Sequence, residues 1–280
     1  MPALPVPVHV DIDGVSVATY TLGPKSSPAG DVVLCHGTPW SAHVWASAAR
    51  HLSRRFRVFL WDMPGYGRSD MRASVPVDLR HQMDVFSGLL EHWDLESPSV
   101  VAHDIGGAVA LGTHLHHRRD FSRLFLWDAV TLTPWGSPFF RLVAENEHVF
   151  AHLPPDLHGA LAEEYIAGAA HHRLPRALVR ELAAPWRGRH GQAGFYRQMA
   201  RVDQTDTEPL VRRLADVRCP VAVGWGADDP WVPFEQAGRL RDALPGDSPV
   251  VVLAGVGHLA PLEDPESVET ALDAWLAGQR

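Results

Sequence analysis

Short runs of aliphatic and β-branched residues alternate along the chain with stretches whose apolar residues recur at helical spacing. A short continuous apolar run is typical of a strand buried on both faces, whereas recurrence every three to four residues is typical of an amphipathic helix. Their alternation predicts an α/β fold with a mostly parallel sheet and crossover helices on both faces. The expected strands lie at 8–14, 15–22, 31–37, 56–63, 98–104, 122–130, 220–227 and 249–255, and the expected helices near 40–54, 78–94, 106–118, 235–244 and 265–277.

Two intervals depart from this alternation. No helix separates the first two expected strands, so we expect them to form an antiparallel edge. Between the sixth and seventh strands, residues 134–208 carry four helical patterns punctuated by Pro and Gly. We name this segment the helical insertion and expect it to form a cap, or lid, over the carboxyl edge of the sheet, where open α/β sheets bind ligands. The predicted core is then 1–133 together with 209–280.

The composition and charge of the chain restrict the class of protein and its partners. Hydrophobic residues make up 46% and charged residues 21% of the 280 positions, which is ordinary for a globular enzyme. The formal net charge of -8 argues against nucleic acid as a partner. We expect no export signal and no membrane span, because the start is not basic and no apolar stretch is long enough. Cys35 and Cys219 flank apolar strands, which indicates buried thiols in a reducing, cytoplasmic setting.

The stretch VVAHDIGGAVAL (100–111) carries the most specific chemical signal. A strand runs into Asp104 and then directly into a helix, and the small residues Gly106 and Gly107 follow. Such a sharp turn needs small neighbours because the helix starts very close to the strand. We therefore expect the turn to hold the Asp104 carboxylate above the sheet edge.

Four motifs in this order resemble the α/β-hydrolases, in the branch whose nucleophile is Asp, which includes epoxide hydrolases and haloalkane dehalogenases. They are HGTPW (36–40), DMPGYGRSD (62–70), AHDIGG (102–107), and the pair WGADDPWVP (225–233) and GVGHLAPLEDP (255–265). The resemblance extends from the first strands to the final helix and fits the helical insertion only loosely. It implies an α/β-hydrolase core of about eight strands with a lid after the sixth.

The chemistry of such a site follows from its residues. A carboxylate with a reference pKa near 3.9 is ionised at neutral pH, so Asp104 needs no base before it attacks a saturated carbon. The resulting alkyl ester must then be hydrolysed by a water molecule that an imidazole activates. The resemblance assigns this base to His258 and its orienting acid to Asp229, with Asp128 after the sixth strand as the alternative acid.

The resemblance also implies an oxyanion hole formed by the backbone amides of Thr38 and Ile105, which would hold the developing charge on the Asp104 carbonyl oxygen. These two positions bear on the leaving group as well. Haloalkane dehalogenases usually have Trp after the nucleophile and often Asn after HG, whereas this chain has Ile105 and Thr38. Fluoroacetate dehalogenases carry Arg residues just after the nucleophile, and HDIGGAVAL has none.

Epoxide hydrolases use lid tyrosines to hydrogen-bond and protonate the epoxide oxygen, since a phenol can do both. Tyr165 and Tyr196 lie in the helical insertion, and we treat both as candidate substrate-binding residues, with packing as the alternative role. Trp40, directly after the oxyanion turn, is a further candidate for the pocket wall. An aromatic, apolar wall would favour a small apolar substrate.

The sequence therefore favours a cofactor-free hydrolase that opens an epoxide to a diol. Dehalogenation is the second hypothesis, and hydrolysis of activated acyl groups, a biosynthetic step or a ligand receptor without turnover remain alternatives. We expect no metal, because the histidines at 114–117 and 171–172 lack the spacing of a metal site. The expected partners are a small organic substrate and water, in a monomer or homodimer.

Overall fold

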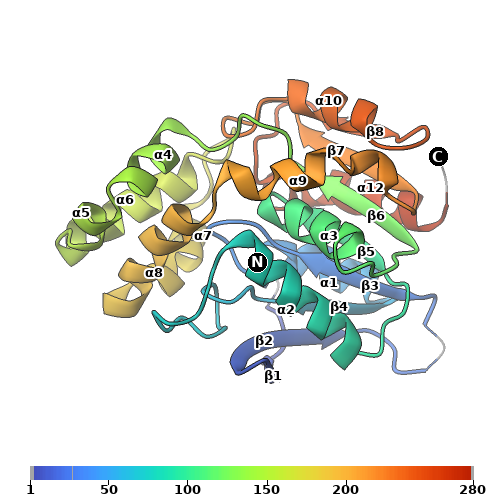
Figure 1. Cartoon of the computed structure of the whole chain (residues 1–280), viewed down its shortest axis with the longest axis horizontal. Coiled ribbons are helices and arrows are strands. Elements are labelled where there is room, and N and C mark those ends of the chain that lie inside the picture. Colours follow the sequence, from blue (N-terminus) through green and yellow to red (C-terminus); the bar gives the residue numbers. More distant parts are fainter. Residues whose placement is uncertain (1–2, 27, 279–280) are drawn as a thin grey trace.

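The computed structural model describes residues 3–26 and 28–278 (Figure 1). The strands are β1 (Val8–Ile12), β2 (Val15–Leu22), β3 (Asp31–Cys35), β4 (Arg57–Trp61), β5 (Ser99–His103), β6 (Arg123–Trp127), β7 (Val221–Gly226) and β8 (Val250–Leu253). They form an eight-stranded sheet in the order β1-β2-β4-β3-β5-β6-β7-β8. β2 pairs antiparallel with both β1 and β4, and the remaining neighbours pair in parallel. The predicted fold and the antiparallel edge are confirmed.

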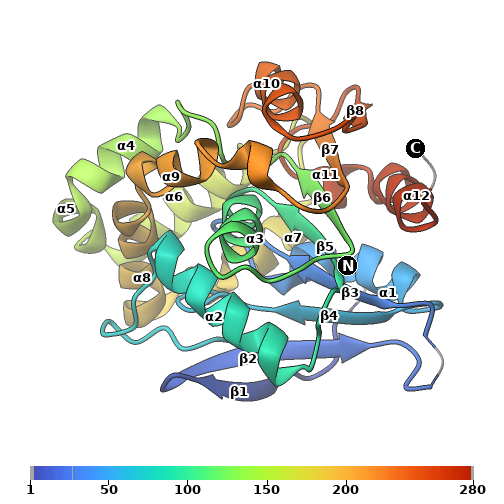
Figure 2. The same cartoon turned by 45° about the vertical axis from the view of Figure 1, so that its right-hand side comes forward.

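Helices cover both faces of the sheet (Figure 2). α1 (Ala46–Leu52) and α12 (Pro265–Leu276) pack together on one face, and α2 (Leu79–His92) and α3 (Ile105–Leu115) pack together on the other. α10 (Glu235–Ala243) lies against β7, and the short α11 (Ala260–Glu263) precedes α12. Because both faces are covered, the middle residues of the inner parallel strands are apolar, and Val32, Val33 and Leu34 of β3 are fully buried.

The register of the parallel strands brings their carboxyl ends to one edge. Cys35 of β3 lies opposite Ala102 of β5, and His103 lies opposite Trp127 of β6. Trp127 in turn lies opposite Gly224 of β7. The loops that leave these strands, which carry the motifs identified in the sequence, therefore begin side by side.

Between β6 and β7 the chain forms α4 (Pro138–Glu145), α5 (Glu147–Ala151), α6 (Pro155–Ala167), α7 (Arg176–Ala183) and α8 (Gly188–Arg201), followed by α9 (Glu208–Val211). α4 to α8 lie together to the left of the sheet in Figure 1. Several hydrogen bonds join this group to the core loops, among them the two that follow. Trp186 Nε1 donates to the carbonyl of Pro39 at 2.8 Å, and the His258 amide donates to the carbonyl of Ala169 at 2.9 Å.

Within the described residues, no helix has the length and apolar character needed to cross a membrane. Cys35 and Cys219 are both buried and free, and burial raises the pKa of each thiol. They pack as small apolar side chains in the core.

Candidate active site

Asp104 lies at the turn between β5 and α3. Its backbone has φ 55° and ψ -128°, a conformation that L residues seldom adopt. The start of α3 lies very close to the loop after β3, which is why glycine follows Asp104. A Cβ on Gly106 would lie 2.4 Å from the carbonyl oxygen of His36. A Cβ on Gly37 would lie 2.3 Å from Cβ of Asp104 itself. The small residues are therefore required by contact between the elbow and the loop after β3.

The structure brings Asp104, His258 and Asp229 together, although they come from three separate loops. His258 Nε2 lies 3.3 Å from Asp104 Oδ2, and His258 Nδ1 lies 2.7 Å from Asp229 Oδ2. Asp229 is fixed in turn, because its Oδ1 accepts hydrogen bonds from the amides of Trp231 at 2.7 Å and Val232 at 2.9 Å. All three side chains are shielded from solvent. The arrangement is that of a nucleophile, a base and an orienting acid.

Electrostatics in this group favour an ion pair. Burial alone would lower the pKa of His258, but the charges and hydrogen bonds of Asp229 and Asp104 raise it well above its usual value. Burial alone would raise the pKa of Asp104, but the hydrogen bond and charge of His258 hold it below its usual value. Both directions favour a charged pair, an Asp104 carboxylate beside a His258 imidazolium.

Two backbone amides converge on the Asp104 carboxylate. The Thr38 amide donates to Asp104 Oδ1 at 2.7 Å, and the Ile105 amide also hydrogen-bonds this carboxylate. The two positions predicted as an oxyanion hole therefore both hydrogen-bond the Asp104 carboxylate through their amides. Oδ1 accepts from the Thr38 amide, and Oδ2 is the oxygen beside His258.

Asp128, the alternative acid, follows β6 with a left-handed backbone at φ 42°. Its side chain is buried, and Oδ1 accepts a hydrogen bond from the Gly226 amide at 2.8 Å. Oδ2 has no hydrogen-bond partner in the described part of the chain. Burial, reinforced by the charge of Asp229, raises the pKa of Asp128 well above its usual value. Asp229, and not Asp128, is the carboxylate that hydrogen-bonds His258.

A small cavity of about 30 Å³ opens on Asp104, room for about one or two water molecules. Residues of the helical insertion, Tyr165 among them, line it together with core loops. Trp231 stacks on Tyr165 with ring centroids 4.6 Å apart and lies 5.3 Å from the His258 ring. The lining residues are Thr38, Asp104, Ile105, Val130, Trp135, Gly136, Ser137, Phe140, Tyr165, Trp231 and Val232.

Tyr165 is the tyrosine of the insertion that lines the cavity beside Asp104. Its pKa is raised, first by burial and then by the negative charge of Asp104. A hydrogen bond with Ser137 partly offsets these effects. The phenol is thus kept protonated beside the carboxylate.

Two predicted pocket residues lie elsewhere. Tyr196 is buried inside the insertion, where its hydroxyl donates to His158 Nδ1 at 2.8 Å, and it does not line the cavity. In this structure Tyr196 therefore takes the packing role that the sequence offered as the alternative. Trp40 is likewise absent from the cavity wall. It stacks on Trp231, which does line the cavity, with ring centroids 5.7 Å apart.

Several residues that support the site had no assigned role in the sequence. Glu263 joins two segments: Oε1 accepts from the Gly257 amide at 3.0 Å, and Oε2 accepts from the amides of His171 and His172 at 2.8 and 3.1 Å. His103 Nε2 lies 2.8 Å from the His258 carbonyl, and burial lowers the pKa of His103 to about 3, so the neutral ring donates this bond.

Two more supporting residues, Tyr66 and Gln198, meet at the side chain of Thr38. Gln198 Oε1 accepts hydrogen bonds from the Thr38 hydroxyl and, at 3.0 Å, from the Tyr66 hydroxyl. No spacing signal in the sequence links these residues. Glu263, His103 and Tyr66 lie within the quoted motifs, whereas Gln198 lies outside all of them.

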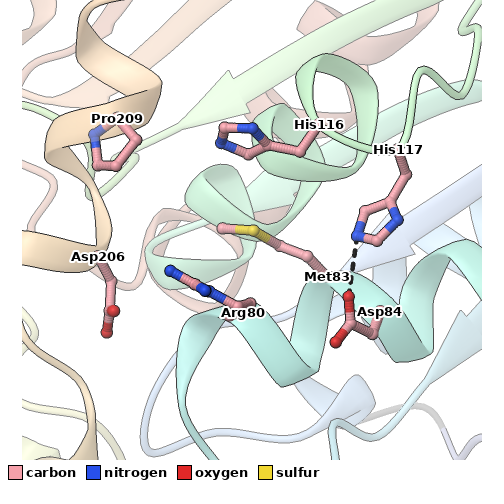
Figure 3. Close-up of a pocket in the computed structure, with 7 residues that line it drawn as sticks. All are labelled: Arg80, Met83, Asp84, His116, His117, Asp206 and Pro209. Atoms are coloured by element: carbon pink, nitrogen blue, oxygen red, sulfur yellow. Dashed lines mark ion pairs between the residues drawn. The ribbon is translucent and has the colours of Figure 1, made fainter.

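A larger hollow of about 370 Å³ lies away from these loops, between α2, the end of α3 and the segment around α9 (Figure 3). Two histidines of the 114–117 cluster, His116 and His117, line this hollow. His117 Nε2 lies 3.0 Å from Oδ1 of Asp84, another lining residue. His114 points inward instead and bonds the Arg119 carbonyl and the Arg218 amide. Among the described residues, no three metal-ligating side chains come together to form a metal site.

Comparison with known proteins agrees with this architecture. A family model for the alpha/beta hydrolase fold matches residues 31–265. The chain therefore belongs to the alpha/beta hydrolase fold family.

Three individual proteins illustrate the range of its relatives. An alpha/beta hydrolase fold protein from Burkholderia ambifaria has a crystal structure with a TM-score of 0.91 and 38% identity, covering 96% of this chain and 97% of that one. A protein of Pseudomonas syringae named "Putative carbamate hydrolase RutD" is 26% identical over 91% of this chain and 96% of its own length. The haloalkane dehalogenase DbeA from Bradyrhizobium elkani has a TM-score of 0.80 with 18% identity, covering 97% of each chain, which is a likeness of fold alone.

Proposed function

We propose that this hydrolase uses Asp104 as a nucleophile and that its substrates are small apolar epoxides, which it opens to diols. The observation that carries the proposal is the Tyr165 phenol, which lines the same cavity as the Asp104 carboxylate. An epoxide differs from a halide in that its leaving oxygen needs a proton, and a phenol beside the nucleophile supplies one.

In the first step, Asp104 Oδ2 attacks an epoxide carbon and the ring C–O bond breaks. The ring oxygen takes the proton of Tyr165, and the imidazolium of His258 supplies the proton that restores the phenol. Asp104 loses its charge on becoming an ester, so one of the two carboxylates that raised the pKa of His258 is gone. His258 is then neutral and able to act as a base.

In the second step, His258 takes one proton from a water molecule whose oxygen attacks Cγ of Asp104. Negative charge develops on Oδ1, which accepts from the Thr38 amide, and the Ile105 amide also hydrogen-bonds this carboxyl group. Collapse breaks the bond between Cγ and Oδ2, and the departing diol oxygen takes the second proton of that water. Asp104 is again an anion and His258 again an imidazolium, so atoms and protons balance.

The apolar wall supports the choice of substrate class. Apart from Thr38, Asp104, Ser137 and the Tyr165 hydroxyl, the side chains that line the cavity are aliphatic or aromatic. Such a wall binds a hydrocarbon substituent and excludes water from the ion pair. The cavity is small, so the lining side chains must move when a substrate binds.

The experiment is to replace the base and trap the ester. His258→Gln protein incubated with styrene oxide should gain the mass of one substrate, with the modification on Asp104 by peptide mass spectrometry. Asp104→Asn in the same background is the matched control and should gain none. A parallel incubation with 1-bromobutane tests halide expulsion as the alternative. If neither a range of epoxides nor haloalkanes modifies Asp104, the nucleophile assignment is wrong.

A further inference from the structure

Gln198 on α8 is a fully buried polar side chain that connects the helical insertion to the oxyanion turn. Its Oε1 accepts two hydrogen bonds, from the hydroxyls of Thr38 and Tyr66. Its Nε2 donates to the carbonyl of Phe195 at 3.0 Å, within the same helix. The amide is thus held at both ends, with its oxygen directed at Thr38.

The contacts of Thr38 make this connection relevant to the site. The Thr38 amide donates to Asp104 Oδ1 at 2.7 Å, and the hydroxyl of the same residue donates to Gln198. A continuous path of hydrogen bonds therefore runs from the nucleophile through Thr38 to α8. A second bond from the insertion, from Trp186 Nε1 to Pro39, holds the next residue of the turn.

We infer that Gln198 is a positioning residue that holds the Thr38 amide on Asp104 Oδ1, so that the helical insertion helps to form the oxyanion hole. Gln198 acts through Thr38 and does not itself line the cavity. The expected effect on ester hydrolysis rests on the proposed function. The expected effect on the mobility of the Thr38 turn does not, and it can be measured without any substrate.

The two chemical steps should depend differently on this contact. During ester formation, negative charge leaves the Asp104 carboxylate, so the demand for amide donors does not increase. During ester hydrolysis, charge develops on Oδ1 in the tetrahedral intermediate, where a displaced donor is most costly. Loss of the Gln198 contact should therefore slow hydrolysis selectively, by roughly 10- to 100-fold, the range expected for a misplaced catalytic group.

The chain offers a matched control on the same helix. Gln192 on α8 is also buried, but its Nε2 bonds only the carbonyls of Ala151 and Leu153, inside the insertion. Gln198→Met and Gln192→Met each remove one buried amide from α8. Only Gln198→Met should disturb Thr38.

The first readout is rapid-quench intact mass spectrometry with His258 in place and styrene oxide as substrate. We expect the Gln198→Met enzyme to form the ester within about threefold of the native rate and to accumulate it at steady state, unlike Gln192→Met. Thr38→Val, which removes the hydroxyl and keeps the amide, should give the same result. The double variant should be no slower than either single one, because both remove the same contact.

The second readout is hydrogen–deuterium exchange of the substrate-free protein. Gln198→Met should speed exchange in residues 36–40, and Gln192→Met should not. Unchanged exchange there in both Gln198→Met and Thr38→Val overturns the inference, whatever reaction the enzyme catalyses. Faster exchange without ester in the His258→Gln trap would instead overturn the proposed function and leave the contact standing. Equal slowing of both steps, or the same effect from Gln192→Met, also overturns the inference.

Discussion

The loops at the strand ends and the helical insertion hold their side chains in different ways. At the strand ends, backbone groups fix the acidic side chains: two amides hold Asp229, and the Thr38 amide holds Asp104. In the insertion, side chains hold one another, as Tyr165 packs against Phe139 and Tyr196 bonds His158. Side-chain geometry in the first region follows from the sheet and its loops, whereas side-chain geometry in the second depends on a few individual contacts.

This difference explains why substitutions in the two regions should have unequal consequences. A strand-end carboxylate is fixed by backbone hydrogen bonds, so replacing it removes a chemical group and little else. A side chain of the insertion packs among aromatic rings, so replacing it changes both packing and chemistry. Paired substitutions within each region separate these contributions.

The largest expected effect concerns the two acids at the strand ends. Asp229→Asn should lower kcat for diol formation by about 10³- to 10⁴-fold, because an amide cannot hold the imidazole in the tautomer that leaves Nε2 free to accept a proton. Asp128→Asn should stay within about threefold of the native kcat, since Asp128 makes no hydrogen bond to His258. Steady-state assays of both variants with one epoxide measure the difference.

Accumulation of the Asp104 ester is a second test of the contrast between Asp229→Asn and Asp128→Asn. Asp229→Asn should accumulate the Asp104 ester, because the first step needs no base. An Asp128→Asn enzyme as inactive as Asp229→Asn would mean that the acid after the sixth strand assists His258, contrary to the geometry described above.

The next effect concerns the two tyrosines of the insertion. Tyr165→Phe should lower kcat/KM for epoxides by about 10²-fold, because the ring oxygen loses its proton donor. Tyr196→Phe should leave kcat/KM within about twofold but lower the free energy of unfolding by about 1 kcal/mol, because His158 loses a buried hydrogen bond. Initial rates and urea denaturation of both variants test this contrast. Equal losses of activity would contradict the placement of Tyr196.

The smallest effect is on stability and depends on pH. The pKa of Asp128 is higher in the folded than in the unfolded chain, so the folded state binds the extra proton. Stability from this group is fully present below the unfolded pKa and falls as pH rises towards the folded pKa. Asp128→Asn keeps the acceptor for the Gly226 amide and removes the titrating group.

Asp128→Asn should therefore increase the free energy of unfolding, and the increase should be larger at pH 8 than at pH 5. A pKa difference of one between the folded and unfolded chain corresponds to about 1.4 kcal/mol. Urea denaturation of both proteins at the two pH values measures the difference. A gain that shrinks with rising pH would show that Asp128 is ionised in the native state.

The contrast between the strand-end loops and the helical insertion also explains which parts of the site could be predicted from the sequence. Asp104 comes directly after β5 and His258 lies in the loop after β8. Parallel pairing places the carboxyl ends of these strands at one edge of the sheet, so residues in the loops that follow can meet there. Asp229 and Asp128 both satisfy that rule, so only the hydrogen bond to His258 distinguishes them.

The insertion follows no such rule. Periodicity predicts its helices, but it does not determine how they rotate and pack against one another, which decides that Tyr165 and not Tyr196 faces Asp104. The contact between Gln198 and Thr38 joins residues 160 positions apart, and no local pattern identifies it.

The buried carboxyl group of Asp128 has an evolutionary consequence. It already lies at the end of the strand next to β7, close enough to be affected by the charges of both Asp229 and His258. If Asp229 orients His258 as we propose, a descendant of this chain that lost Asp229 would still carry a buried acid at the end of β6. That acid is a starting point from which the orienting role can pass to a neighbouring strand.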